Sequence, residues 1–176
     1  PWSHDRRIDS VGLGEFVGVV QRFIAADTAG RASDAIALVL PLGADVPYCE
    51  LATDGYQVIS GVALGPAIEK GDTGFVIVRY RVLGVANSED PHLMGPRYWR
   101  FHADVHTEVD TFTVLRDSTG HLGIGCGPRI PPNHLGIEAW RENVSLLDAP
   151  SRRLCDSVTK TVPATPSGSL RPWRRR

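Results

Sequence analysis

The sequence predicts a single α+β domain, because helical and strand periodicities occupy separate parts of the chain. Near the N-terminus, apolar residues from Val11 to Ile24 recur at spacings of three and four, as on one face of a helix. From Tyr56 onward, segments rich in β-branched residues alternate between apolar and polar positions, as in strands. The 176 residues suffice for one core and are too few for two ordinary domains.

Two helices are expected before the strands. The first covers about residues 10–29, and the second covers residues 33–40, where Pro41 ends it. The first helix carries three glycines, which do not form a phosphate-binding loop because no strand precedes them. We interpret them as allowing close packing of this helix on a sheet; they are Gly12, Gly14 and Gly18.

Strands are expected at 45–51, 56–64, 73–85, 98–115 and 121–125, with a turn-rich loop at 87–97. The long strand from Tyr98 to Leu115 divides its side chains with a period of two. One side carries in order His102, Asp104, His106, Glu108, Asp110, Phe112 and Val114. This side therefore changes from polar to apolar along the strand. If it is concave, its apolar end lies deeper in the molecule than its polar end.

The C-terminal part is expected to leave the sheet at Pro131-Pro132, since consecutive prolines cannot donate to a ladder. Asn133 is positioned to cap a last helix that continues to about residue 147. Beyond it, Ser, Thr, Pro and Arg predominate. The expected organisation is a lead-in at 1–9, one domain at 10–149 and a basic, flexible tail at 150–176.

Charge and composition exclude several classes of protein. The segment 151–176 holds seven basic residues and one acidic residue, a net charge of +6, whereas the whole chain has a net charge of −1. An acidic body with a basic tail argues against a nucleic-acid-binding domain, whose basic residues would lie on a folded face. No apolar run approaches the roughly 18 residues of a membrane span. The first residue is Pro1 rather than methionine, which slightly favours an exported protein and leaves a cytoplasmic one open.

The cysteines do not form a metal-binding or redox motif. Cys49, Cys126 and Cys155 make an odd number without CxxC spacing. One disulfide with one free thiol, or three thiols, are both compatible with the sequence. Cys126 precedes a proline turn without a catalytic context, so we interpret it as packed or disulfide-bonded rather than nucleophilic.

The order of elements resembles the nuclear transport factor two-like superfamily, which includes ketosteroid isomerases and polyketide cyclases. The similarity is clearest in the strand GFVIVRYRVLG at 74–84 and in VDTFTVLRDSTGHLGIGCGPRIPPNHL at 109–135. Exported bacterial members have a TFTLVR-like strand, a tight turn, a short strand and a PPH-like segment in this order. The resemblance implies N-terminal helices packed in a strongly curved antiparallel sheet, a cone or cystatin-like roll. It also implies a ligand cavity at the wide end and, in many members, a dimer formed through the sheet.

Candidate catalytic residues follow from the two-sided strand. Asp110 and His106 are acid/base candidates, because a carboxylate or imidazole beside apolar side chains is suited to proton transfer. Tyr80 on the neighbouring strand is the candidate hydrogen-bond donor. Residues expected to line a ligand pocket are Phe112, Val114, Val78, Val82 and Trp99. No metal site is expected, since His102 and His106 lie about 13 Å apart along a strand, and no cofactor motif is present.

Three functions remain open from the sequence. The first is binding of a small apolar or amphipathic ligand, or of a partner, without an identifiable catalytic apparatus. The second is an isomerase, cyclase or dehydratase that uses Asp110, His106 and Tyr80. The third is a homodimeric interaction subunit. The orientation of the strand 98–115 distinguishes between the first two.

Overall fold

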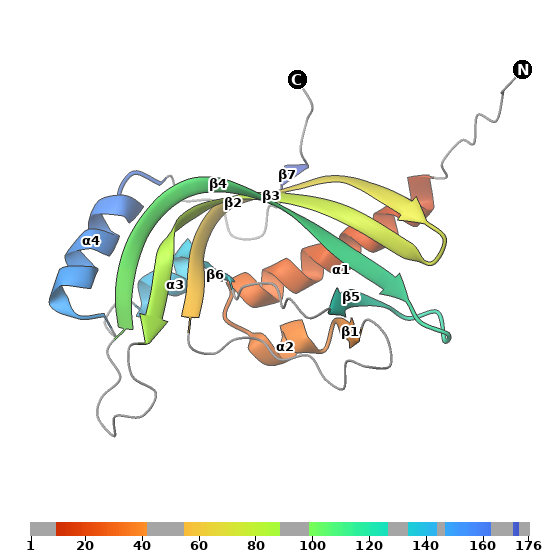
Figure 1. The fold of residues 1–176 in the computed structure, drawn as a ribbon, viewed down its shortest axis with the longest axis horizontal. Helices are drawn as coiled ribbons and strands as arrows, with labels where there is room; N and C mark the ends of the chain where they lie inside the picture. The colour runs from red at the N-terminus through yellow and green to blue at the C-terminus, as the bar shows by residue number, and fades with distance from the viewer. Residues whose placement is uncertain are drawn as a thin grey trace, which may run out of the picture.

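The computed structural model shows an α+β fold in which helices cover one side of a strongly curved sheet (Figure 1). It describes residues 10–41, 55–88, 99–126, 134–143, 147–162 and 171–172. The helices are α1 (Ser10–Thr28), α2 (Ala32–Ile36), α3 (Ile137–Asn143) and α4 (Ala149–Thr159). The strands are β1 (Val39–Pro41), β2 (Gly55–Lys70), β3 (Thr73–Ser88), β4 (Trp99–Arg116), β5 (Leu122–Cys126), β6 (His134–Gly136) and β7 (Arg171–Pro172). The predicted fold class is therefore confirmed at the level of α+β.

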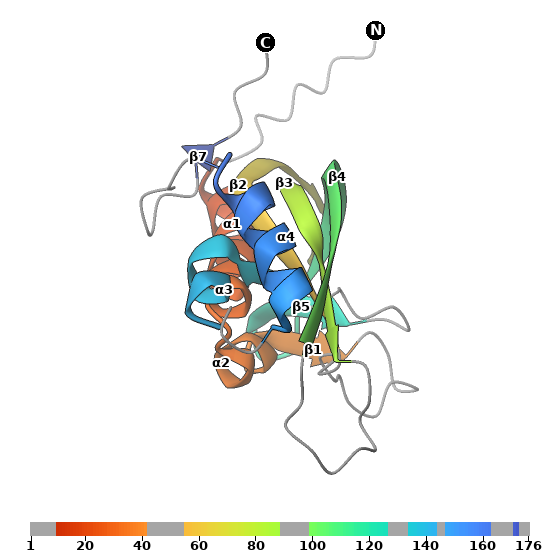
Figure 2. The same ribbon diagram turned by 90° about the vertical axis from the view of Figure 1, so that its left-hand side faces the viewer.

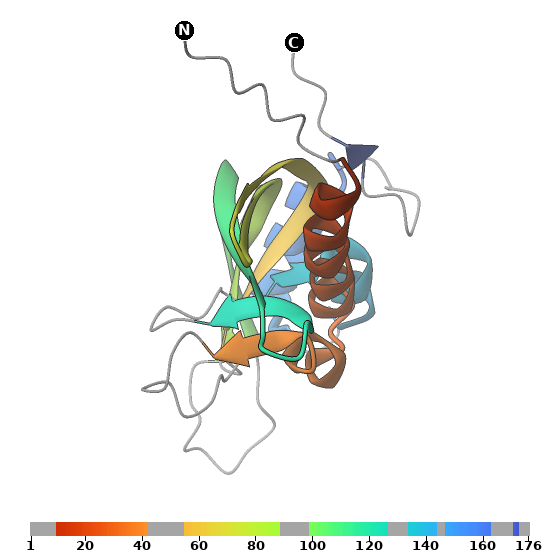
Figure 3. The ribbon, with the colours of Figure 1, turned by 90° about the vertical axis from the view of Figure 1, so that its right-hand side faces the viewer.

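The sheet is mixed rather than wholly antiparallel. Its order is β1-β5-β4-β3-β2-β6, with β7 also paired to β2. The strands β5, β4, β3 and β2 are antiparallel neighbours, whereas β1, β6 and β7 pair in parallel. The long strands arch over α1 (Figure 1), and α1 and α3 lie across from β4 when the molecule is turned to either side (Figures 2 and 3).

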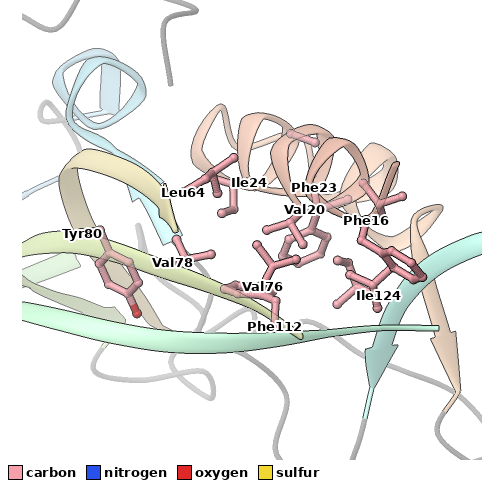
Figure 4. Packing of buried hydrophobic residues seen from close by; sticks show 14 of the residues in the cluster. Phe16, Val20, Phe23, Ile24, Leu64, Val76, Val78, Tyr80, Phe112 and Ile124 are labelled. Atoms are coloured by element: carbon pink, nitrogen blue, oxygen red, sulfur yellow. The ribbon is translucent and has the colours of Figure 1, made fainter. Parts of the chain in front are cut away.

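The first hydrophobic cluster fills the space between α1 and the sheet (Figure 4). Phe16, Val20 and Phe23 on α1 are almost fully buried, as the spacing of three and four predicts. They face Val76, Phe112 and their neighbours on β3 and β4, and the Phe23 and Phe112 rings lie 5.8 Å apart. Burial of each such side chain contributes roughly 1.5–3 kcal/mol, so this cluster anchors α1 in the arch.

A second hydrophobic cluster lies at the other end of the long strands, where α3 and α4 pack. Its buried residues include Leu83, Phe101, Trp140, Leu147 and Cys155. Between the two clusters the β3–β4 register shifts, from Val82 opposite His106 to Gly84 opposite Ala103. The shift is a β-bulge, which inserts one residue and reverses the alternation of the strand beyond it.

The bulge changes which side chains of β4 are buried. After it, Phe112 and Val114 are buried and Val109 is exposed; before it, Phe101 is buried. The predicted single alternation over 98–115 is thus correct for the second half of the strand and wrong for the first. Gly84 permits the bulge, because a Cβ there would overlap the His102 carbonyl oxygen and the Phe101 ring.

Close packing of α1 on the sheet depends on a glycine of the sheet rather than on Gly14 or Gly18, and the surroundings of Gly12 lie outside the described residues. A Cβ on Gly74 would lie 2.5 Å from the Phe16 ring, whereas one on Gly14 would meet nothing and one on Gly18 would meet only the Arg22 side chain. The predicted packing role of Gly14 and Gly18 is therefore wrong. Helix α1 has the predicted extent, but the second predicted helix stops at Ile36, because residues 39–41 pair with β5 instead.

The C-terminal region differs most from the prediction. Residues 134–136 form β6 beside β2, so the last predicted helix begins only at Ile137. The predicted tail boundary is also wrong for its first residues, since α4 is folded onto the body. Its Ser151 hydroxyl accepts a hydrogen bond from the Phe101 N–H at 3.0 Å. The strand predicted at 45–51 and the Pro131-Pro132 segment lie outside the described residues.

Candidate acid–base site

Tyr80 and Asp110 meet on the inner side of the sheet. Asp110 lies opposite Val78, and Tyr80 lies opposite Glu108, so the two side chains are diagonal neighbours on one side of the β3–β4 pair. The Tyr80 hydroxyl donates a hydrogen bond to Oδ2 of Asp110. Tyr80 is only 2% exposed, whereas Asp110 is half-buried. The pair therefore joins a buried phenol to a carboxylate that solvent reaches.

The contact continues inward through His134. Its Nε2 lies 3.1 Å from the Tyr80 hydroxyl oxygen, and the two rings meet edge to face with centroids 4.9 Å apart. Its Nδ1 lies 2.9 Å from Oδ2 of Asp27, which also accepts the His134 backbone N–H at 3.2 Å. His134 is 2% exposed and Asp27 is 6% exposed. Asp27, His134, Tyr80 and Asp110 form a continuous chain of hydrogen-bonding groups, which we call the polar chain.

Four separate elements supply the polar chain. Asp27 lies near the end of α1 on the side that carries Phe23 and Ile24. His134 is the first residue of β6, where it lies beside Gln57 of β2. Tyr80 lies at the edge of the first hydrophobic cluster, away from the α1 side chains (Figure 4). Because each group is fixed by its own helix or strand, the arrangement is held without a loop.

The surroundings keep the Tyr80 phenol protonated. Burial raises the pKa of Tyr80 most, and the hydrogen bond and negative charge of Asp110 raise the pKa further. The charges of Glu108 and Asp27 act in the same direction. A phenol that does not ionise serves as a donor and, through its oxygen, as an acceptor.

A second polar group borders the chain. Gln57 Nε2 lies 3.4 Å from Oε2 of Glu108, and His106 Nε2 lies 3.5 Å from the same oxygen. Oε1 of Gln57 is buried and has no hydrogen-bond partner among the described residues. Desolvation lowers the pKa of His106, but the carbonyl and carboxylate of Asp104 and the carboxylate of Glu108 outweigh it, so this pKa lies above its ordinary value.

Among the predicted catalytic residues, the structure brings Asp110 and Tyr80 together and leaves His106 at the surface. The His106 side chain is 42% exposed, and its contacts are with Asp104 and Glu108. His102 lies beyond the bulge, opposite Val85. The polar-to-apolar change on the inner side is as expected from Asp110 to Val114.

The predicted pocket residues have a different position. Val78, Val82, Phe112 and Val114 are at most 4% exposed and belong to the first hydrophobic cluster. They were predicted to line a ligand pocket, but their side chains pack in the core with those of α1. Trp99 is half-buried against Tyr56, with ring centroids 5.3 Å apart. A ligand near Asp110 would thus contact the polar groups at the edge of this core.

Two residues of the polar chain were not predicted. His134 follows Pro131-Pro132 in the segment that carries the family resemblance, and Asp27 lies on the apolar face of the first predicted helix. A signal for Asp27 was present, because an acidic residue at spacings of three and four from Ile24 and Phe23 interrupts an apolar helix face. For His134 the sequence contains no comparable signal, since its partners lie 107 and 54 residues away.

The cysteines take one of the two expected arrangements. Cys126 is buried and disulfide-bonded, as its interpretation as packed or bonded anticipates. Cys155 is a buried free thiol whose Sγ lies 2.7 Å from Nε1 of Trp140. Burial raises the pKa of the Cys155 thiol, so this group is not an activated nucleophile.

Other classes of site find no support in the described part of the chain. Within those ranges, no three His, Cys, Asp or Glu side chains are grouped so that they could hold a metal ion. No helix there combines the length and apolar character needed to cross a membrane. Comparison of the chain with protein-family models, with curated proteins and with solved structures gives no match.

Proposed function

We propose that this protein is an acid–base catalyst that moves a proton to or from a small apolar or amphipathic molecule bound beside Asp110. The observation that carries the proposal is the polar chain, which joins a solvent-accessible carboxylate to a buried phenol, imidazole and second carboxylate. A carboxylate isolated at the surface has no such chain of hydrogen-bonding groups behind it. Isomerisation, cyclisation and dehydration all require proton transfer of this kind.

The apolar surroundings favour this function over ligand binding alone. Val78 and Phe112 flank Asp110 on the inner side of the sheet. A substrate bound at their edge would be shielded from water, which strengthens interactions with the carboxylate.

A carbon acid tests the proposal without knowledge of the natural substrate. Nitrobenzisoxazole opens when a base removes its ring C–H proton and the N–O bond breaks to give a cyanophenolate. We expect the protein to accelerate this reaction, and Asp110→Asn to lower the rate about a hundredfold. Asp104→Asn is the matched control, because Asp104 lies on the same strand and its side chain is 69% exposed. Equal rates for the wild type and Asp110→Asn would refute the proposal.

We also infer that the fold is of the nuclear transport factor two-like type and that the protein is exported. N-terminal helices followed by a strongly curved sheet support the first inference. The disulfide at Cys126 supports the second, because disulfides persist in oxidising compartments. Mass measurement of protein isolated under alkylating conditions should show two cysteines oxidised and one alkylated. Three alkylated thiols would argue against export.

A homodimer formed through the outer side of the sheet is a second candidate function. Val109, Val105 and Ile68 are 58%, 47% and 59% exposed, so the strands carry apolar side chains that face solvent. A second copy of the chain would cover them. Sedimentation of the wild type should then give the mass of a dimer, and a monomer at all concentrations would remove this candidate.

A further inference from the structure

The polar chain contains more contacts than its simplest protonation state can satisfy. Each hydrogen bond needs one hydrogen between two atoms. The chain has three such side-chain contacts: Asp27 to His134, His134 to Tyr80, and Tyr80 to Asp110. With both carboxylates ionised and His134 neutral, only two hydrogens are available, one on the imidazole and one on the phenol.

The Tyr80 hydroxyl cannot supply both of its neighbours. If it donates to Asp110, its oxygen faces Nε2 of His134, which must carry a hydrogen of its own. If it donates to Nε2, its oxygen faces Oδ2 of Asp110, and the carboxyl group must then be protonated. In either arrangement Nδ1 of His134 donates to Asp27, since a carboxylate only accepts.

With two hydrogens, two lone pairs would face each other at a short contact. Tyr80 and His134 are each 2% exposed, so water cannot relieve such a contact between the Tyr80 hydroxyl and Nε2 of His134. Solvent reaches Asp110, but its Oδ2 lies within hydrogen-bond distance of the Tyr80 hydroxyl, so this contact also needs a hydrogen between its two oxygens. An unsatisfied buried polar group destabilises the folded state. A third proton removes this destabilisation in both arrangements.

We infer that the polar chain holds three protons at neutral pH, and that the third moves between Asp110 and His134 through the Tyr80 hydroxyl. In this step the Asp110 proton passes to the phenol oxygen while the phenol proton passes to Nε2. Asp110 becomes a carboxylate and His134 becomes an imidazolium, and the net charge of the chain is unchanged. Asp27 stabilises the imidazolium through Nδ1.

The charged groups around the chain favour retention of this proton. Asp27 on α1 contacts His134, and Asp110 and Glu108 on β4 act on Tyr80 from the other side. Gln57 on β2 is neutral, and its amide points to Glu108. Three carboxylates thus act on a pair of rings that can carry one positive charge.

The third proton gives His134 and Asp27 a role in the reaction. When His134 is the imidazolium, its Nε2 proton can pass through Tyr80 to Asp110, and Asp110 can then give it to a substrate. The chain is left with two protons and regains the third from a substrate or from water. His134 and Asp27 are positioning residues in this scheme, because they act through Tyr80 and Asp110. Their role in turnover rests on the proposed function, whereas the number of protons does not.

The proton count can be measured directly by nuclear magnetic resonance on the full chain with isotope-labelled histidine and aspartate. At neutral pH we expect the protonated fractions of His134 and of the Asp110 carboxyl to sum to one. A neutral His134 beside an ionised Asp110 at neutral pH would overturn the inference. Surface-exposed His106 provides the internal reference.

Two variants test whether the third proton moves between Asp110 and His134 through the Tyr80 hydroxyl, a step that we call the relay. Tyr80→Phe removes the bridge, so His134 should become neutral and Asp110 ionised at neutral pH. Asp110→Asn should leave His134 neutral, because the amide N–H donates to the Tyr80 oxygen and the hydroxyl then donates to Nε2. Asp110→Asn still provides the test if the Tyr80→Phe protein does not fold. An imidazolium that persists in either variant refutes the relay. A silent carbon-acid assay with the expected proton count would instead refute only the proposed function.

Discussion

The two hydrophobic clusters at opposite ends of the long strands satisfy their polar groups in different ways. In the second cluster the buried hydrogen bonds join separate pairs: the Trp140 indole N–H donates to Cys155, and the Phe101 N–H donates to Ser151. At the edge of the first cluster, four ionisable side chains depend on one another in sequence.

The difference favours the edge of the first cluster as the place of the proposed proton transfer. Pairwise hydrogen bonds stabilise packing and leave no path for a proton, whereas a continuous chain provides one. A buried ionisable chain is also expensive, because removing charged groups from water costs several kcal/mol per ion. The second cluster needs only to hold α3 and α4, and its polar groups are neutral. We therefore expect changes in the two clusters to have different consequences for stability and for proton transfer.

The largest effect is expected from breaking the buried contact between Asp27 and His134 in the polar chain. His134→Ala leaves the Asp27 carboxylate, 6% exposed, with only a backbone N–H. Removing one partner of a buried pair costs about 3–5 kcal/mol. Urea unfolding should therefore show a loss of this size in the free energy of unfolding.

A second substitution distinguishes an uncompensated charge from a cavity. Asp27→Asn in the His134→Ala background replaces the unpaired carboxylate with a neutral amide, and we expect it to recover part of the stability. A cavity alone would not respond to this change. A double variant that is less stable than His134→Ala would contradict a charged Asp27.

A smaller effect is expected in the second cluster. Trp140→Phe removes the indole N–H donated to Cys155 and some buried area, and should cost about 1–2 kcal/mol in urea unfolding. The rate with nitrobenzisoxazole should not change, because Trp140 lies outside the polar chain. Leu154→Ala on α4 is the control: Leu154 is 41% exposed, and its loss should be within about 0.5 kcal/mol. A folded Trp140→Phe protein without activity would contradict the expectation that the second cluster affects stability but not proton transfer.

The sequence predicts the first cluster well, because that cluster follows the two simple periodicities. Spacings of three and four identify Phe16, Val20 and Phe23, and alternation identifies Phe112 and Val114. The β-bulge at Gly84 could not be predicted, since a register shift depends on the partner strand. Beyond it, alternation assigns Phe101 to the wrong side.

The polar chain could be predicted only in part. Tyr80 and Asp110 lie on adjacent strands, so alternation and neighbouring strands suffice to suggest their contact. His134 and Asp27 meet them through tertiary packing of β6 and α1, across 54 and 107 residues. No local pattern encodes such contacts. An acidic residue on the apolar face of α1 was the one visible sign.

In the C-terminal region composition and capping signals point in opposite directions, and the structure follows the capping signals. Ser and Arg residues after position 150 suggested a flexible tail. Asp148 followed by Pro150 is nevertheless a helix-start pattern, and these residues begin α4. The Oδ1 of Asp148 accepts the Ser151 N–H at 2.8 Å.

The smallest expected effect is the pH dependence of this cap. Hydrogen bonds from the side chain and then the backbone of Ser151 lower the pKa of Asp148 below its ordinary value. The stability from the cap is therefore complete above the unfolded-state pKa and is lost as the pH falls through the folded-state pKa. Asp148→Ala should lower Tm by a few degrees at neutral pH, and the difference from wild type should narrow on acidification. An asparagine at position 148 caps the helix without titrating, so the difference in Tm between Asp148→Asn and Asp148→Ala should persist at acid pH. If the difference in Tm between the wild type and Asp148→Ala also persisted at acid pH, a charged cap would be contradicted.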